Sequence, residues 1–569
     1  MNKYFSGLFS VFLQSFWKHY IAWSFIIISV YTLCYSWLIY TTHGEFVYVD
    51  TDCYTRALRI VDWMQNFEWQ EKIFPYNNYP NGFVLHFTRI NDIIWLIFTL
   101  PFLPFLPLKE AVFYGGFFFS PFFMILTLIS VLWGIKPYIE KVKDNKLFFF
   151  LIFVFSILFC CKLTSVFDFY RPDHHCLMGF VFSFVIAALL RSYKLKQNYK
   201  ELFTAGILSG VGLWASSAPE GLYIAGTALL ILTIDVIFSA KDSKNPMYYA
   251  MGFFYANLIA WLINPPLGGY GIFNNARLSV IHVALSALIL ASFIAFHFGN
   301  FHGKLKQISA LCGFSALSAV IMLILFGTKN LFAPIYEEPV LKYFVPLITE
   351  MAPLDFILLP SVALGMIIAS YMSFKLPHER CLSLLFLITA PLSMFVARFY
   401  IYYICAFAPL YAYGLITLFA LKNKGDKYKS ALFLYMVLPI FYFAWYEYKY
   451  ERIQTVELKG VVLADTFNGP ELTWIQNVDT VASPHHTNVE GIRDNRIMWF
   501  TTDENKLKEL LKKREVNYIT LYNVIESEYY ANPDDNTDKL YGKVLTGKNI
   551  YPWMEKTDER TYRINYDKF

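Results

Sequence analysis

The stretch IAWSFIIISVYTLCYSWLIY, residues 21–40, decides the class of this protein. It contains no charged residue, and it has the length of about 20 residues that an α-helix needs to cross the hydrocarbon core of a bilayer. It follows Lys18 and is too long and too aromatic for a cleaved signal peptide. We therefore interpret it as a retained first span, with the amino terminus expected in the cytoplasm.

Similar apolar runs recur along the chain, whose 569 residues are 56% hydrophobic and 19% aromatic. They predict about 13 transmembrane helices: 21–40, 112–133, 147–161, 177–190, 202–217, 222–238, 248–263, 280–298, 308–326, 356–374, 382–396, 399–421 and 431–443. The run at 93–106 is excluded, because Pro101 and Pro104 interrupt it and it is short for a crossing.

The basic loops support this count. Lys and Arg gather at 136–146, 191–200, 241–244, 304–306, 375–380 and 422–429, which all fall on one side in this arrangement, the cytoplasmic one by the usual bias. The opposite side receives the large loops 43–92 and 327–355. The sequence thus predicts a polytopic α-helical, multi-pass protein of the cytoplasmic (inner) membrane, in contact with its lipid.

Residues 446–569 form a polar tail that follows the transmembrane part, residues 1–445. A helix is predicted at 504–514 and a strand at 516–521, so we expect an extracytoplasmic (periplasmic) C-terminal α/β domain. The eight cysteines all lie at or before Cys405 and imply no disulfide framework. The net charge of +5 belongs to the cytoplasmic loops, and we expect no nucleic-acid partner.

Three acidic clusters fall on the extracytoplasmic side: Asp50-Thr51-Asp52, Asp173-His174-His175, and Glu350. Ionisable residues at the ends of spans are functional candidates, because hydrocarbon does not tolerate stray charges. Mg²⁺ and Mn²⁺ prefer carboxylate oxygens, and Mn²⁺ also accepts imidazole. The ligand set that this pattern predicts for a divalent metal ion is Asp52, Asp173, His175 and Glu350.

Each cluster also has an ordinary interpretation. An Asp just before a helix is often an N-cap, and we favour Asp52 over Asp50 for the metal because 54–63 has the pattern of an amphipathic interfacial helix. The turn with His174 could be a solvated connection between spans. Glu350 could be one more acid of an exposed loop.

Arginines at the same face are candidates for binding an anionic substrate. Arg398 lies between two apolar runs, where an unpaired guanidinium is expensive, and a phosphate is a natural partner. Arg171 could pair with Asp173 or face the same phosphate. Glu220 is a further acid at this face, to which the sequence assigns no role.

These motifs resemble those of the oligosaccharyltransferase catalytic subunit, in its bacterial and archaeal single-subunit form, within the C-type glycosyltransferase superfamily. The resemblance rests on Asp50-Thr51-Asp52-Cys53-Tyr54, on Asp173-His174-His175, on Thr349-Glu350, and on Arg398-Phe399 before Ala408-Pro409. It covers the whole membrane part and implies thirteen spans. It also implies catalytic roles for Asp52, Asp173 and Glu350 and a phosphate contact for Arg398. Arg171, His86, in a stretch similar to one of that family, and Tyr54 are further candidates for binding the substrate.

One motif of that family is missing. Its Trp-Trp-Asp-Tyr-Gly segment, which reads the hydroxyl residue of an Asn-x-Ser/Thr acceptor, should lie early in the tail. The tail instead has residues 461–471 and then Ser483-Pro484-His485-His486. His485 and His486 are candidates for a replacement acceptor contact, or else part of an ordinary surface loop.

The expected function is therefore a metal-dependent glycosyltransferase that moves a glycan from a polyprenyl-(pyro)phosphate carrier to a protein acceptor. An alternative is an enzyme that modifies lipopolysaccharide or another envelope glycan from a polyprenyl-phosphate sugar. A transporter is disfavoured, because transporters place acids near the bilayer midplane and these acids lie in outer loops.

Overall fold

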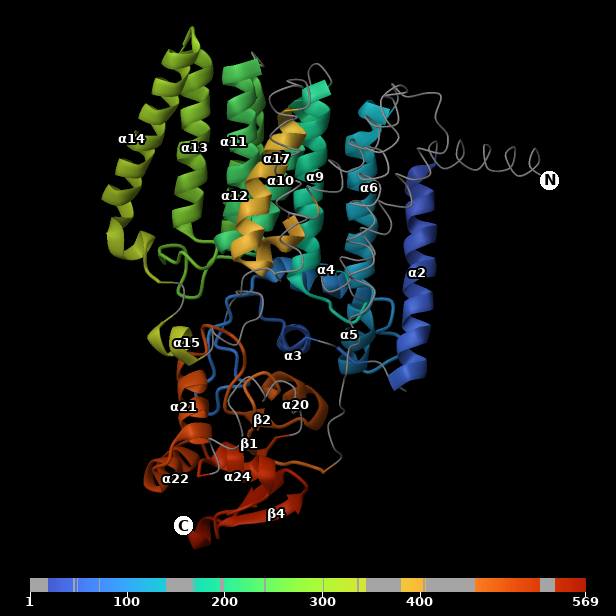
Figure 1. The fold of residues 1–569 in the computed structure, drawn as a ribbon, viewed down its shortest axis with the longest axis vertical. Coiled ribbons are helices and arrows are strands. Elements are labelled where there is room, and N and C mark those ends of the chain that lie inside the picture. Colours follow the sequence, from blue (N-terminus) through green and yellow to red (C-terminus); the bar gives the residue numbers. More distant parts are fainter. Residues whose placement is uncertain are drawn as a thin grey trace, which may run out of the picture.

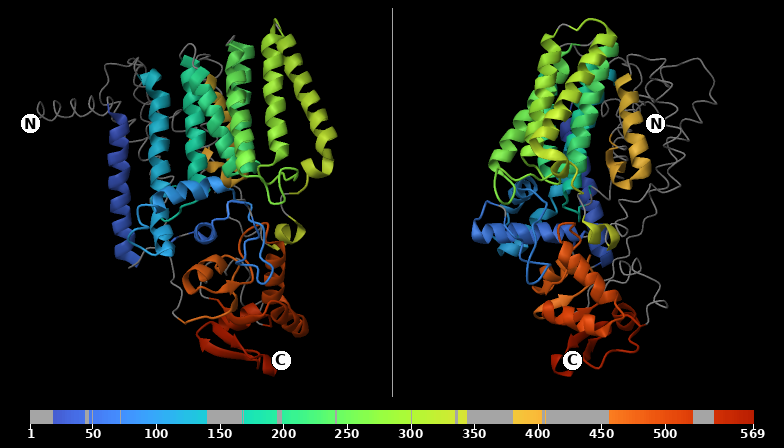
Figure 2. Two further views of the ribbon diagram at one scale, coloured as in Figure 1. Left: turned by 180° about the vertical axis from the view of Figure 1, so that it is seen from behind. Right: turned by 90° about the vertical axis from the view of Figure 1, so that its left-hand side faces the viewer.

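The computed structural model describes residues 19–43, 47–48, 50–70, 72–139, 167, 169–194, 199–239, 242–299, 301–334, 337–343, 380–402, 405, 456–521 and 538–569. Long helices stand side by side in one layer, short helices and loops lie beneath it, and a small sheet domain follows (Figures 1 and 2). The predicted spans 147–161, 356–374 and 431–443 lie outside the described residues, as do Glu350 and all of the predicted span 399–421 except residues 399–402 and 405.

The long helices of the layer each overlap a predicted span, although α6 begins seven residues after the start of the span predicted at 112–133. They are α2 (Tyr20–His43), α6 (Phe119–Ile139), α9 (His174–Lys194), α10 (Tyr199–Ala215), α11 (Leu222–Ser239), α12 (Lys244–Ile263), α13 (Val280–Phe298), α14 (Lys304–Leu331) and α17 (Arg380–Phe395). Among the described residues, five segments are long and apolar enough to cross a membrane: Leu108–Pro137, His174–Ser192, Pro219–Phe238, Val280–Phe298 and Lys304–Leu331. The protein is thus a multi-pass membrane protein, and the total of 13 spans stays a prediction.

The outer helices expose large apolar side chains, as a lipid-facing surface requires. Trp37 on α2 is 71% exposed and Ile324 on α14 is 77% exposed. Inside the layer, α10 and α12 approach closely at Gly206, where a methyl group would collide with the carbonyl oxygen of Tyr249 on α12. Small residues at such contacts let helix backbones pack where no water drives association.

The run excluded from the spans forms α4 (Arg89–Thr99), a helix of 11 residues. At 1.5 Å per residue it is about 16 Å long, roughly half of the hydrocarbon thickness. Helix α5 (Leu108–Gly116) follows it and leads into α6. The length of α4 agrees with its exclusion from the spans.

Helix α3 (Thr51–Asn66) is the predicted amphipathic helix and lies between the helical layer and the sheet domain (Figure 1). The Asp50 side chain accepts a hydrogen bond from the Asp52 amide at 3.0 Å, which makes Asp50 the N-cap. Asp52 is therefore in the first helical turn, where the helix dipole favours a negative charge.

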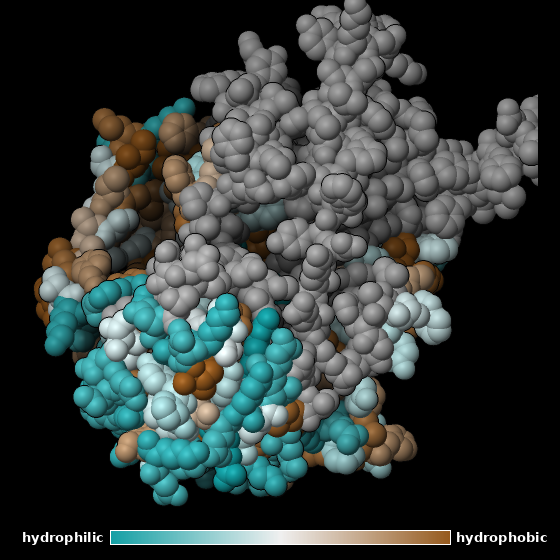
Figure 3. Space-filling model, turned by 60° about the horizontal axis from the view of Figure 1, so that its bottom comes forward, coloured by the Kyte–Doolittle hydropathy of each residue, from teal (hydrophilic) through white to brown (hydrophobic). Residues whose placement is uncertain are grey.

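The C-terminal domain holds a five-stranded sheet in the order β2-β1-β3-β5-β4. Its strands are β1 (Val461–Leu463), β2 (Asp479–Thr480), β3 (Val516–Thr520), β4 (Met554–Asp558) and β5 (Thr561–Ile564). Strand β1 is parallel to β2 and β3, and β5 is antiparallel to β3 and β4. Hydrophilic side chains cover the face of this domain that Figure 3 shows.

Its helices are α20 (Gly469–Gln476), α21 (Val489–Phe500), α22 (Glu504–Lys513), α24 (Leu540–Thr546) and the short η9 (Tyr566–Lys568); α15 (Glu338–Tyr343) lies beside α21 (Figure 1). The predicted helix at 504–514 and strand at 516–521 are confirmed as α22 and β3. The Asp503 side chain caps α22, and Leu507, Leu510 and Leu511 are buried on one face, which fixes the helix on the sheet.

A buried arginine joins this domain to the loop that follows α3. Arg514 pairs with Asp494 at 2.7 Å and donates hydrogen bonds to the Asn78 side chain at 2.8 Å and the Tyr79 carbonyl at 2.9 Å. Its side chain is 0% exposed. The loop and the C-terminal domain are therefore held together by a fully desolvated guanidinium.

A second set of contacts surrounds Asn77 of the same loop. Its side-chain amide donates to the hydroxyls of Thr473 at 2.7 Å and Thr480 at 2.8 Å. Its backbone carbonyl accepts a hydrogen bond from the Asn488 side chain at 2.6 Å. These bonds fix the segment 480–488, which carries His485 and His486, beneath the helical layer.

Candidate active site

The candidate residues lie where regular helices begin or break, at the end of the helical layer that faces the C-terminal domain. Asp173 directly precedes α9, Glu220 lies in the π-helical turn η1 (Ser217–Gly221), and Arg398 lies in the 3₁₀ turn η5 (Ala397–Phe399). Single π turns of this kind often occur at functional sites. His174 and His175, predicted in a loop, form the first turn of α9 instead.

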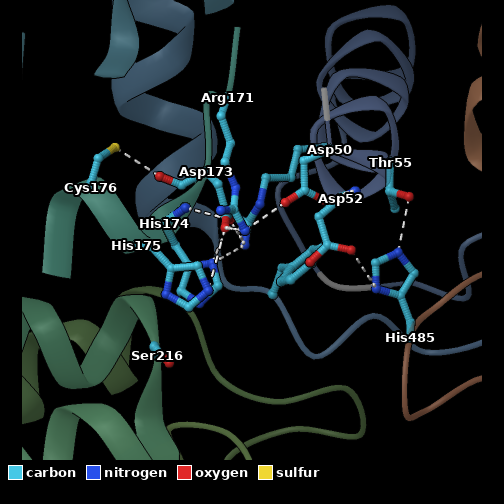
Figure 4. Close-up of polar contacts among 12 residues, drawn as sticks. Asp50, Asp52, Thr55, Arg171, Asp173, His174, His175, Cys176, Ser216 and His485 are labelled. Carbon is cyan, nitrogen blue, oxygen red and sulfur yellow. Dashed lines mark hydrogen bonds and ion pairs between the residues drawn. The ribbon is translucent and has the colours of Figure 1, made fainter. Parts of the chain in front are cut away.

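Asp173 and the two histidines form the centre of the site (Figure 4). Potential metal-ligand atoms of Asp173, His174 and His175 all lie within 4.8 Å of one another, and all three residues are buried. The Asp173 carboxylate is 2.6 Å from Nδ1 of His174 and 3.5 Å from Nε2 of His175. Burial alone would raise the pKa of the Asp173 carboxyl, but His174, His175 and Arg56 hold it well below its usual range.

Glu220, to which the sequence assigned no role, lies in the same cluster. Its carboxylate is 0% exposed and accepts hydrogen bonds from Nε of Arg398 at 3.1 Å and from the Ser216 hydroxyl at 2.7 Å. It also lies 3.3 Å from Nδ1 of His175 and 3.6 Å from Nε2 of His174. Arg398 thus has a carboxylate as a partner, and its Nη2 is also 3.5 Å from Nε2 of His174.

Arg171 and Asp50 form an ion pair beside this cluster. Their side chains are 2.7 Å apart, whereas Arg171 is 4.0 Å from Asp173 (Figure 4). Of the two roles predicted for Arg171, pairing with an acid is seen, with Asp50 as its nearer partner. Asp50 serves both this pair and the cap of α3.

Asp52 faces the C-terminal domain. One of its oxygens is 3.7 Å from Nδ1 of His485, whose Nε2 is 2.9 Å from the Thr55 hydroxyl (Figure 4). Its side chain is 27% exposed, and it is not part of the group formed by Asp173, His174 and His175. The structure therefore brings together Asp173 and His175 of the predicted ligand set, and does not place Asp52 in that group.

Three histidines line the junction between the loop and the C-terminal domain. The ring of His86 is 4.3 Å from that of His486 and 5.8 Å from that of His485, between ring centroids. Burial lowers the pKa of His485 to about 3 and of His486 to about 4, and that of His86 falls well below its usual value for the same reason. All three imidazoles are therefore neutral near pH 7.

Tyr54 is almost fully buried at this junction. Its hydroxyl accepts a hydrogen bond from the Tyr48 amide at 3.1 Å and lies 3.5 Å from the Glu471 carboxylate of α20. These contacts join α3 to the C-terminal domain, and the substrate contact predicted for Tyr54 stays a prediction.

Sequence reasoning did not single out Arg56, which contacts the centre of the site. Its guanidinium is 2.9 Å from Nδ1 of His174 and 3.4 Å from Asp173, and it stacks 3.6 Å above the ring of Phe87. A signal was available, because Arg56 follows Asp52 by four residues and so shares its helix face.

The fold is similar to that of solved membrane proteins, although no similar sequence family is found. No protein-family model matches the chain, and neither does any curated protein sequence. Solved structures do match: the archaeal oligosaccharyltransferase AglB from Archaeoglobus fulgidus, in complex with an inhibitory peptide and a dolichol-phosphate, has a TM-score of 0.63 at 14% identity, over 94% of this chain and 79% of that one.

Two further structures of the Archaeoglobus fulgidus oligosaccharyltransferase agree. The form tethered to an acceptor peptide with the NVT sequon has a TM-score of 0.61 at 15% identity, over 97% of this chain and 74% of that one. The complex with Zn and sulfate has a TM-score of 0.56 at 16% identity, over 87% and 67%. The chain has the fold of an archaeal oligosaccharyltransferase.

Proposed function

We propose that the protein is a metal-dependent membrane glycosyltransferase of the oligosaccharyltransferase type. It would transfer a glycan from a polyprenyl-(pyro)phosphate carrier to a protein acceptor on the extracytoplasmic face of the cytoplasmic membrane. One observation carries this proposal: Asp173, His174, His175, Glu220 and Arg398 converge at one end of the helical layer, within the fold of an oligosaccharyltransferase.

The residues present fit a divalent metal ion such as Mn²⁺ or Mg²⁺. Two ligand atoms that bind one cation at about 2.1 Å each are roughly 3 to 3.5 Å apart, and Asp173 and Nε2 of His175 are 3.5 Å apart. Asp173 and His175 would hold the ion, with Asp52 and Glu350 as further proposed ligands. Such an ion would offset the negative charge that develops on the departing phosphate.

Arg398 is the proposed phosphate contact. Its side chain is 20% exposed, and Glu220 at 3.1 Å from Nε and His174 at 3.5 Å from Nη2 orient the guanidinium. Guanidinium groups bind phosphate through paired N–H donors. The similar structure of AglB was solved in complex with a dolichol-phosphate, which supports this role. Arg171 is a second proposed contact.

Asp52 is the proposed contact to the acceptor nucleophile. Its carboxylate is 27% exposed, whereas those of Asp173 and Glu220 are 1% and 0% exposed. An acceptor that entered between the helical layer and the C-terminal domain would reach Asp52 first among these three. His86, His485 and His486 would line its path as neutral donors and acceptors.

The acceptor need not carry an Asn-x-Ser/Thr sequence. A site that reads a hydroxyl rejects acceptors without it because its own polar groups would be left unpaired, and the Trp-Trp-Asp-Tyr-Gly segment that forms such a site is missing from this sequence. We propose that the enzyme does not require this sequence, and that Ser/Thr attachment or a non-protein acceptor is to be expected at least as much as attachment to Asn. The same missing segment favours, as a second function, the modification of lipopolysaccharide or another envelope glycan.

A deletion strain separates these functions. Mass spectrometry of its glycopeptides, beside its lipopolysaccharide profile, should show glycans lost from proteins and an unchanged lipopolysaccharide. A changed lipopolysaccharide with intact glycoproteins would support the second function. If every lost glycan were attached to an Asn two residues before Ser or Thr, the proposal on acceptor choice would be wrong.

A further inference from the structure

The two histidines of the cluster make different contacts with Asp173. Nδ1 of His174 is 2.6 Å from the carboxylate, a direct hydrogen-bond distance that leaves no room for a cation between the two atoms. Nε2 of His175 is 3.5 Å from the other oxygen, the separation of two ligands that share one ion. His175 is therefore the histidine whose Nε2 can bind an ion together with Asp173.

We propose that Glu220 is a positioning residue for His175, an inference that rests on the metal-dependent function proposed above. A neutral imidazole has one N–H donor and one lone pair. Glu220 lies 3.3 Å from Nδ1 of His175, so its carboxylate keeps the proton on Nδ1 and leaves the lone pair of Nε2 directed toward Asp173. Carboxylates that accept from the second nitrogen of a metal-binding histidine fix the ring and raise its basicity.

Glu220 is placed to orient the His175 ring rather than to bind the ion itself. One of its oxygens contacts Arg398 at 3.1 Å and His175 at 3.3 Å, and the other accepts from Ser216 at 2.7 Å. Its oxygens are not among the atoms that lie within 4.8 Å of one another at Asp173. Because both oxygens are engaged by these neighbours, the carboxylate is fixed in a position outside that group.

The π turn η1 provides the rigidity that this role needs. The Gly221 amide donates to the Ser216 carbonyl at 2.9 Å, and a side chain at Gly221 would collide with the backbone of Leu213 on α10. The turn is thus pressed against a neighbouring helix. One rigid carboxylate then links the proposed metal ligand His175 to the proposed phosphate contact Arg398.

The test measures metal affinity rather than activity. The purified full-length protein is titrated with Mn²⁺, and free Mn²⁺ is followed by electron paramagnetic resonance. Glu220→Gln should raise the Kd by about 10- to 100-fold, as expected when the outer partner of a ligand is lost. The matched control is Glu68→Gln, since Glu68 is 57% exposed and pairs only peripherally, with Lys72 at 3.1 Å; its Kd should equal that of the wild type.

A double variant distinguishes positioning from direct electrostatic attraction. In the His175→Ala background, Glu220→Gln should cause no further loss, because the histidine through which it acts is gone. An additive loss, or an unchanged Kd in the single variant, would overturn the inference. A wild type that binds no Mn²⁺ would instead overturn the metal-dependent function as well, so the two failures are distinguishable.

A milder variant guards against misfolding of Glu220→Gln. Ser216→Ala removes the hydroxyl that holds the far oxygen of Glu220 and leaves every proposed ligand intact. It should raise the Kd by about 2- to 10-fold, less than Glu220→Gln, because the lost hydrogen bond acts on the ion only through the orientation of Glu220 and His175. An unchanged Kd in a protein with wild-type thermal stability would also contradict the positioning role.

Discussion

At the scale of single residues, the acids of the site differ chiefly in their access to solvent. Asp173 and Glu220 are buried among arginine and histidine side chains, whereas the Asp52 side chain is 27% exposed. Buried carboxylates of this kind persist only because each has several charged or hydrogen-bonding neighbours. Burial thus separates the two enclosed acids from Asp52, the one proposed to contact the acceptor.

Removing charge at either class of acid should stop transfer. Asp173→Asn and Asp52→Asn should each lower the transfer rate by at least about 100-fold, because each removes a negative charge at the reaction centre with little change of shape. Membrane levels, measured by immunoblot, should stay near those of the wild type. Glu350→Gln is expected to behave likewise.

The control for these variants is Asp62→Asn, since Asp62 lies on the same helix α3 but pairs with Lys72 at 3.0 Å, away from the cluster. It should keep full activity. A strong chelator should inactivate the wild type as the substitutions do, and full activity in its presence would contradict the metal-dependent mechanism.

The neutral histidines predict an acid-sensitive junction. His486 has a folded pKa of about 4 against an ordinary value of 6.5 because it is buried, and the pKa of the adjacent His86 is lowered too. Since the unfolded chain then binds more protons between those values, stability should be constant above pH 6.5 and fall as the pH drops from 6.5 toward 4.

Thermal unfolding of the purified protein between pH 7.5 and 5 measures this dependence. In His486→Gln the fall between pH 6.5 and 5 should be shallower, because one of the titrating groups is absent. An identical pH dependence in the variant and the wild type would show that His486 does not contribute to it.

At the scale of elements, the side chains of the proposed site lie at helix ends and in short π and 3₁₀ turns. Asp173 precedes α9, Glu220 lies in η1, Arg398 lies in η5 and Asp52 is in the first turn of α3. Helix ends leave backbone groups unsatisfied and carry partial charges, so they suit ionic substrates. The intact middle parts of the helices supply the rigid layer between them.

The junction of the loop with the C-terminal domain depends on Arg514. Arg514→Met should destabilise the domain by about 3 kcal/mol, because it leaves the buried Asp494 carboxylate without its main partner. Faster tryptic cleavage of the C-terminal domain in intact membranes would report this. Adding Asp494→Asn should restore part of the protection, since the unpaired charge is then removed; no recovery in the double variant would assign the loss to packing instead.

Much of the architecture followed from hydrophobic patterns, whereas the site followed only in part. Long apolar runs predicted the membrane helices because their backbone polar groups must be satisfied within the segment, and the helix-like stretch 504–514 followed by the apolar, β-branched run 516–521 predicted α22 and β3. Glu220 had no such signal of its own, and that of Arg56 was only its four-residue spacing from Asp52. Their roles depend on which distant helix ends meet, and 178 positions separate Glu220 from Arg398.

At the scale of the whole molecule, the helical layer and the sheet domain meet over the site, with loop residues 72–88 between them (Figure 2). Neither part alone contains all of the contacts, because His485 of the C-terminal domain faces Asp52 and Thr55 of α3. The site is therefore a property of the assembled chain.

The orientation of this assembly in the membrane can be tested with reporters. A fusion after Lys143 should read as cytoplasmic, and fusions after Asp173 or within the C-terminal domain should read as external, because the basic loops are expected inside. Reporter pairs that are active only on opposite sides of the membrane give the measurement. An external signal at Lys143 would change the span count and place the acidic clusters on different faces.

The junction between α3 and residue His485 also has a consequence for biosynthesis. A ribosome releases α3 early and the segment 480–488 late, after more than four hundred further residues have been translated; His485 and Thr55 are 430 positions apart. A nascent chain that has not yet reached residue 480 therefore lacks the segment that contacts α3. The contacts of Asp52 and Thr55 with His485 can form only after that segment has been translated.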